Sequence, residues 1–286
     1  MRLFATVTLN GLALASLYFI VASGFTLIFG LMRVVNMAHG SLYLLGGYVG
    51  YQVQLATGNW PLAVAAGAAA AAVVGLALQT ALFGWMQGQD LRQALVAIGV
   101  SIVLADVMLA QWGGTTYQLA LPQVLHGFVP VPLVHRYALG RLALIGGAVS
   151  IGVGLWLLLS QTRIGALIRA GVDDRQMLEA LGVDVPLVFL GVFAIGAALA
   201  GLAGVVGGTV LSLAPGEDAR YLLSSLIVVI VGGMGSIPGA AIGAVLVGLA
   251  ESYGLAYAPT YSVTFTFMIM VLVLAVRPRG LLGRPA

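Results

Sequence analysis

The sequence contains neither cysteine nor lysine. The absence of cysteine excludes disulfides and thiol catalysis. The absence of lysine removes the residue with which a P-loop reaches the β and γ phosphates, so any ATP-driven work needs a partner protein. The three histidines (His39, His126 and His135) show no metal-ligand spacing, and no paired carboxylates or nucleophile motif appear. We therefore expect no enzyme chemistry and no cofactor or metal bound by this chain.

Charge is also scarce, because only 7% of the residues are charged, whereas about 25% is usual for a soluble domain. The chain is 61% hydrophobic, with a mean hydropathy of +1.09, which predicts an integral membrane protein in a lipid bilayer. The net charge of +3 is too small to indicate nucleic-acid binding. The apolar runs do not alternate with polar residues, so we expect spanning helices and no barrel strands.

We therefore predict an all-α, polytopic helical bundle of eight or nine spans, with residues 1–286 forming a single transmembrane domain. The predicted spans are residues 4–30, 40–56, 61–86, 92–112, 139–160, 186–211, 221–234, 238–257 and 261–276.

The arginine pattern predicts the orientation of these spans. Arginines gather at 163–175 and 277–284, which places both segments, and hence the C-terminus, in the cytoplasm. Residues 113–137 then form the longest external connection, either a contact surface for an external partner or a plain covering loop. If residues 40–56 cross fully, nine spans put the N-terminus outside. If they are re-entrant, eight spans put it inside.

Residues 163–184, here called the polar segment, hold seven of the 21 charged residues in 22 positions. We expect Asp173 to cap a short helix over 174–181, with Gln176 at its third position and Gly182 ending it in a left-handed conformation. The helix would present polar and apolar residues together, as a docking element or as an ordinary loop helix. Its polar residues are Arg175, Gln176 and Glu179, and its apolar residues are Met177, Leu178 and Leu181.

Two glycine-rich breaks interrupt the spans, at 30–40 and 232–239. The span before the second break, 221–234, is too short to cross a bilayer unaided. Such interruptions often mark half-helices beside a transport pathway. Both breaks contain a Gly-x-Met element, which suggests an internal repeat that relates them.

Polar residues near these breaks, and carboxylates within spans, are candidates for a translocation pathway or gate. Asn36, His39 and Tyr43 would share one helix face, where they line a pathway or form hydrogen bonds between helices. Asp106 and Glu251 would lie within spans. Asp106 either lines a pathway or pairs with an arginine of another span. Glu251 either lines a pathway or reaches out to the bilayer interface. The candidates are Asn36, His39, Tyr43, Asp106, Gly233, Gly235, Ser236 and Glu251.

Several motifs in order resemble one known family over nearly the whole chain. They are GFTLIFG at 24–30, VNMAHG at 35–40, RAGVDDRQMLEALG at 169–182, GGMGSIPG at 232–239, ES at 251–252 and RPRGL at 277–281. The chain is similar to the permease subunits of ABC importers for branched-chain and other hydrophobic amino acids, the LivH type.

The resemblance implies a multi-pass protein of the bacterial cytoplasmic (inner) membrane. Its partners would be a second permease subunit, either a sister chain or a second copy, two cytoplasmic ATPases that hold ATP-Mg, and an external solute-binding protein. The solute would be a leucine-like amino acid, or urea, a short amide or an aromatic acid. The polar segment would supply the helix that couples to the ATPase, with Asp173, Asp174, Arg175, Gln176, Glu179, Ala180 and Gly182.

This chain departs from the general importer pattern E-A-A-x-x-x-G, because Gly182 follows Glu179-Ala180 after one residue. An alternative from another class is a secondary transporter or channel driven by an ion gradient. Asp106 and Glu251 would then be its coupling carboxylates.

Overall fold

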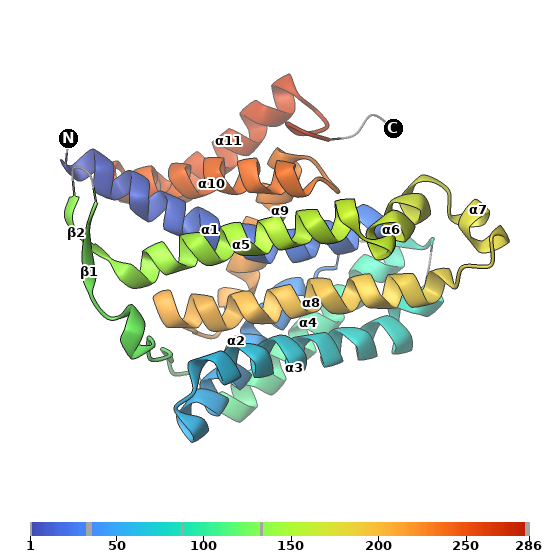
Figure 1. Cartoon of the computed structure of the whole chain (residues 1–286), viewed down its shortest axis with the longest axis horizontal. Coiled ribbons are helices and arrows are strands. Elements are labelled where there is room, and N and C mark those ends of the chain that lie inside the picture. Colours follow the sequence, from blue (N-terminus) through green and yellow to red (C-terminus); the bar gives the residue numbers. More distant parts are fainter. Residues whose placement is uncertain (1, 33–35, 87, 132–133, 284–286) are drawn as a thin grey trace.

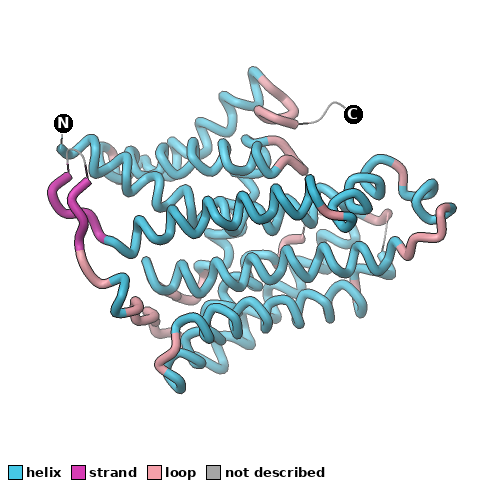
Figure 2. Tube along the Cα trace, in the orientation of Figure 1, coloured by secondary structure: helices cyan, strands magenta, loops and turns pink. Residues whose placement is uncertain are grey.

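The computed structural model describes residues 2–32, 36–86, 88–131 and 134–283, and the chain is almost entirely helical (Figures 1 and 2). All nine predicted spans are helices, with ends shifted by a few residues. The elements are α1 (Arg2–Met32), α2 (His39–Thr57), α3 (Trp60–Ala81), η1 (Phe83–Met86), α4 (Asp90–Trp112), η2 (Gln123–Leu125), β1 (Phe128–Val131), β2 (Val134–Ala138), α5 (Leu139–Gln161), α6 (Arg163–Asp173), α7 (Arg175–Ala180), α8 (Val185–Val210), α9 (Glu217–Gly232), α10 (Ile237–Tyr257), η3 (Pro259–Tyr261) and α11 (Ser262–Val276).

Side-chain caps and prolines set several helix starts. Asn59 accepts the amide of Leu62 at 3.1 Å before α3, and Ser236 accepts the amide of Gly239 at 3.1 Å before α10. Both helices also carry proline in their first turn. These groups satisfy amides that have no partner within the helix, a requirement that is strict where water is excluded.

Two elements differ from the prediction. The connection over residues 113–137, predicted to be external, contains a short antiparallel hairpin, β1–β2, while the predicted helical bundle is confirmed. The polar segment holds two helices, α6 and α7, where one was predicted.

Seven of the described helices have the length and composition to cross a membrane: α1, α3, α4, α5, α8, α10 and the segment Pro259–Val276 that contains α11. The other two predicted spans are α2, which is rich in glycine and polar residues, and α9, which has only 16 residues. Both begin inside the bundle. His39 at the start of α2 reaches the carbonyl of Val21, partway along α1, at 3.0 Å.

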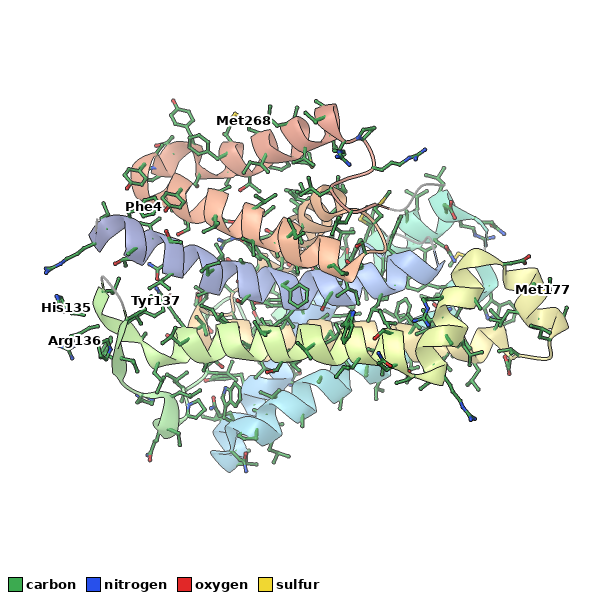
Figure 3. The ribbon with its side chains drawn as sticks, turned by 45° about the horizontal axis from the view of Figure 1, so that its top comes forward. Phe4, His135, Arg136, Tyr137, Met177 and Met268 are labelled. Atoms are coloured by element: carbon green, nitrogen blue, oxygen red, sulfur yellow. The ribbon has the colours of Figure 1, made fainter. Side chains whose placement is uncertain are left out.

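The long helices run between two ends of the molecule. One end, here called the hairpin end, carries the N-terminus and β1–β2, and the other, here called the α7 end, carries α6, α7 and the C-terminus (Figure 1). Figure 3 places His135 and Arg136 at the first end and Met177 at the second. The termini therefore lie at opposite ends, as an odd number of crossings requires.

The chain has two halves that contain the same order of helices and run in opposite directions. Helices α1, α2, α3 and α4 are matched by α8, α9, α10 and α11: a long helix, a short helix that starts inside, a second long helix and an outer helix. The short 3₁₀ elements η1 and η3 precede the two outer helices. Helix α1 packs along α10, as α3 packs along α8. The chain is thus an inverted repeat.

This repeat differs from the one that the shared Gly-x-Met element suggested. The segment after α1 corresponds to the segment after α8, residues 211–216, and not to the break at 232–239. The first break includes residues 33–35, which lie outside the described residues. The two breaks do meet, because a Cβ added at Gly30 would lie 2.9 Å from Cα of Gly235.

Small residues hold α8 against its neighbours. A Cβ at Gly204 would overlap the backbone oxygen of Tyr43 in α2, and a Cβ at Gly201 would overlap the backbone oxygen of Gly67 in α3. Close helix approach through such seams is common in membranes, where packing rather than the hydrophobic effect holds helices together.

We expect Gly204→Ala to lower stability by about 1–3 kcal/mol, because two backbones would have to separate. Gly146→Ala in α5 is the matched control, since nothing lies within 4 Å of an added Cβ there. Alanine should raise the stability of that exposed helical site by about 0.5–1 kcal/mol. Thermal unfolding followed by size-exclusion chromatography measures both. Equal melting temperatures for the two variants would contradict the close packing of α8 against α2 at Gly204.

Candidate functional site

The two short helices α2 and α9 meet at their N-termini. A Cβ at Gly40 would overlap the backbone oxygen of Asp218, and the Ser41 hydroxyl donates to a carboxylate oxygen of Asp218 at 3.3 Å. Both helix dipoles point their positive ends at this junction, so the carboxylates of Glu217 and Asp218 in the first turn of α9 are well placed to offset them.

A group of tyrosines fills the junction. Tyr43 is the fifth residue of α2 and Tyr221 the fifth of α9, and their ring centroids lie 4.1 Å apart. Tyr18 of α1 packs edge-on against Tyr221 at 6.3 Å. All three are almost completely buried. The tyrosines therefore connect the two halves of the inverted repeat.

A charged cluster continues from these tyrosines. Glu251 of α10 accepts the Tyr18 hydroxyl at 2.5 Å and Arg220 Nη2 at 3.0 Å. Arg220 Nη1 reaches Glu217 at 3.4 Å. The Glu251 side chain is only 11% exposed, whereas that of Arg220 is 48% exposed. One guanidinium is thus shared by two carboxylates, and the cluster carries one excess negative charge.

This cluster lines a cavity of about 600 Å³ on the hairpin-end side of the junction. Its walls come from the first half of α1, the start of α5, the end of α8, the start of α9 and the last part of α10. Across from the cluster, Arg141 donates to the side-chain oxygen of Asn10. The remaining lining is largely aliphatic, with Leu14, Leu17, Leu144, Val210, Leu211 and Leu255.

Asn36 and His39, predicted pathway residues, lie buried at the start of α2. Asn36 accepts the amide of Ala38 at 3.1 Å, while the His39 ring packs edge-on against Phe25 at 5.5 Å. Neither lines the cavity. Glu251 does line it, and Tyr43 contacts Tyr221, which also does. Of the two alternatives for Glu251, the one in which it reaches out to the bilayer interface is wrong, because Glu251 is buried and ion-paired.

The remaining candidates lie away from the cavity. Asp106 is exposed on the outer face of α4, with no arginine paired to it among the described residues. Gly233, Gly235 and Ser236 lie at the α7 end, where they form the turn between α9 and α10. Gly233 and Gly235 have φ of 106° and 78°, so the turn needs glycine at both places.

The C-terminal tail closes this turn. Backbone amides of Leu281 and Leu282 donate to the carbonyls of Val231 and Gly232, each at 2.9 Å. These bonds satisfy carbonyls at the end of α9 that have no partner within the helix.

The polar segment forms the tip of the α7 end. The cap of α7 is Asp174 and not Asp173, because Asp174 accepts the amide of Met177 at 2.9 Å and Asp173 ends α6. Gly182 has φ of 80°, and its amide bonds to the carbonyl of Glu179 at 3.0 Å, as the predicted left-handed ending requires. The helix is shorter than predicted, Arg175–Ala180.

The exposed surface of α7 is partly apolar. Met177 is 60% and Leu181 74% exposed, whereas Leu178 is buried and faces inward. Glu179 and Ala180 are exposed. The side chains of Asp173, Arg175 and Gln176 lie outside what the structure describes.

Sequence reasoning missed five residues of the site: Tyr18, Arg141, Glu217, Arg220 and Tyr221. Arg220 was placed just before a span, although its spacing from Glu217, three residues earlier, is typical of a helical ion pair. The equal positions of Tyr43 and Tyr221 in the two halves were a second available signal.

A polytopic bundle with an inverted repeat, two half-helices and a charged interior cavity defines a multi-pass membrane permease. Its sequence identifies the family: residues 7–274 match the family described as branched-chain amino acid transport system / permease component, and the chain belongs to it.

Relatives extend over almost the full length. The chain is 31% identical over 301 residues to the high-affinity branched-chain amino acid transport system permease protein BraD of Pseudomonas aeruginosa, covering 96% of this chain and 94% of BraD. It is 30% identical over 292 residues to the corresponding protein LivH of Salmonella typhimurium, with the same coverage. A solved structure, PsaBC from Streptococcus pneumoniae in complex with Fab, shares the fold with a TM-score of 0.54 and 14% identity, covering 94% of this chain and 91% of that chain.

Proposed function

We propose that this chain is the transmembrane permease of an ABC importer for branched-chain or other hydrophobic amino acids. The observation that carries the proposal is the junction of two half-helices beside a charged cavity, in a chain of this permease family. Inverted repeats with broken helices place solute sites at the interface between the repeats, which supports a solute site beside this junction. The whole chain acts as one transmembrane domain.

Helices α6 and α7 couple the chain to ATPase subunits that bind ATP-Mg, since this chain has no lysine for a P-loop. The support is the position of α7 at the tip of one end and its exposed Met177 and Leu181, which are costly in water and suit a protein contact. The α7 end and the C-terminus then lie in the cytoplasm. The hairpin end faces outward, where a solute-binding protein delivers the solute.

Asp106 supports contact with a second permease subunit. A carboxylate within a spanning helix costs about 2.5–3.5 kcal/mol in lipid at the helix centre. Its exposure on α4 therefore favours a protein or aqueous neighbour over lipid on that face. The second subunit, a sister chain or a second copy, would cover this face of α4 and enclose part of the pathway.

An ion-driven transporter is a weaker candidate. Its coupling carboxylates would be Asp106 and Glu251, but Glu251 is already paired with Arg220 and Asp106 lies on a different face of the bundle. Such a transporter also has no use for the capped helix α7.

Co-purification in mild detergent tests the assembly. We expect ATPase subunits and a second permease to elute with the chain, and Asp106→Leu to lose the second permease while the chain still elutes as a folded monomer. Val107→Leu, a change at the adjacent exposed position, is the control. Elution of the chain without either partner would contradict the proposal.

A further inference from the structure

The cavity at the hairpin end separates charges of opposite sign. On one wall, Glu217 and Glu251 share Arg220, which leaves one excess negative charge. On another wall, Arg141 bonds to the neutral side chain of Asn10 and forms no ion pair with any described carboxylate. The four ionic groups sum to zero, so the cavity is neutral and dipolar.

A free α-amino acid is also neutral and dipolar, with a carboxylate and an ammonium group on one carbon. We infer that this cavity is a binding site for the zwitterionic head of an α-amino acid, with Arg141 recognising the carboxylate and the Glu217–Glu251 wall recognising the ammonium. The inference rests on the proposed function and adds to it the site and the residues that recognise the two charged groups of the solute. It requires no change in the ion pair of Glu251 and Arg220.

The aliphatic lining supplies the rest of the recognition. Leucine side chains from α1, α5 and α10 line the space with the charged groups, as a branched aliphatic side chain requires. A volume of about 600 Å³ lies within the range of small-molecule sites, about 300–1,000 Å³. Urea has neither a carboxylate nor an ammonium group, so it would form no charge-assisted hydrogen bond of opposite sign with either wall.

The cavity lies where a solute arriving from outside would first meet the chain. It is on the hairpin-end side of the α2–α9 junction. Tyr221 lines it, and the buried Tyr18 and Tyr43 contact Tyr221. Arg141 is the third residue of α5, near the hairpin end, and Glu251 lies deeper. The solute would therefore enter with its carboxylate held nearer the outer face.

Direct binding tests the site. The complex that co-purifies with the chain is placed in nanodiscs without the external binding protein, and binding of radiolabelled L-leucine is measured. Competition uses 4-methylpentanoate, which keeps only the carboxylate, and 3-methylbutylamine, which keeps only the ammonium. We expect saturable leucine binding, lowered about tenfold or more by Arg141→Gln, because a charge-assisted hydrogen bond is lost.

The variants should also differ in which of the two leucine analogues competes well. Arg141→Gln should weaken competition by 4-methylpentanoate more than by the amine, Glu217→Gln should do the reverse, and Arg141→Lys should recover part of the affinity. Arg92→Gln, an exposed arginine in the first turn of α4, is the matched control and should bind as the unchanged protein does. Melting curves verify that each variant is folded.

Equal binding by Arg141→Gln and Arg92→Gln would overturn the inference. So would the absence of leucine binding in a complex that still takes up leucine with ATP, and that result would leave the proposed function standing. Uptake that needs no ATPase subunit would instead contradict the proposed function, whatever the binding result.

Discussion

Replacing Glu251 with alanine should destabilise the chain by about 2 kcal/mol and abolish uptake, because it removes the acceptor of the buried Tyr18 hydroxyl and one of the two carboxylates that pair with the half-exposed Arg220. Arg220 Nη2 and the Tyr18 hydroxyl both donate to this carboxylate. Glu217 keeps its contact with Arg220 at 3.4 Å, so the guanidinium retains one carboxylate. For a chain of this size the loss corresponds to a melting temperature lower by roughly 4–8 °C.

A double variant separates charge from packing. Changing Glu251 and Arg220 together to methionine removes both charges and keeps much of the volume, so most of the stability should return. Uptake should stay absent, since the charged wall of the cavity is gone. If the Glu251→Ala variant has the same melting temperature as the unchanged protein, the ion pair does not stabilise the packing of α9 against α10.

Changing Met177 and Leu181 to serine should lower ATP hydrolysis by the assembled importer about tenfold or more. Both side chains are more than half exposed, so folding should be unaffected, whereas apolar anchors at the centre of an interface often contribute 2 kcal/mol or more. Basal and solute-stimulated hydrolysis are measured in proteoliposomes, together with the melting temperature of the chain.

Val124→Ser is the matched control for this pair. Val124 is 85% exposed but lies in η2, which leads into the hairpin at the opposite end. Basal hydrolysis should be unchanged in this variant. Full hydrolysis by the Met177 and Leu181 double variant would remove α7 from the coupling mechanism.

The positions of the helices were predictable because long charge-free runs in lipid leave the backbone only one conformation that satisfies its polar groups. The left-handed end of α7 at Gly182 was also predictable, because the ending of a helix depends on the residues next to it in the sequence. Helix α6 was not predicted, because the helix signal in this segment was assigned to residues 174–181 alone. Thr162, which caps α6, was an available signal for it. The hairpin was missed because Pro130 argues against a strand, although prolines are tolerated in edge strands.

The arrangement of the candidate site depends on tertiary contacts that sequence spacing does not specify. The pairing of α2 with α9 brings Tyr43 to Tyr221 across 178 positions, and α10 brings Glu251 to Arg220. Glu251 was found as a carboxylate within a span, but its partners were not. Arg141 could not be recognised, because an arginine at a helix start is usual at a membrane surface.

Uptake of radiolabelled L-leucine into proteoliposomes tests the central claim most directly. The vesicles contain this chain with its second permease and ATPase subunits, and the external binding protein is added outside. The account predicts uptake with hydrolysable ATP inside the vesicles and none with a non-hydrolysable analogue, whether or not a proton or sodium gradient is imposed. Uptake that follows such a gradient in vesicles lacking the ATPase subunits would contradict it.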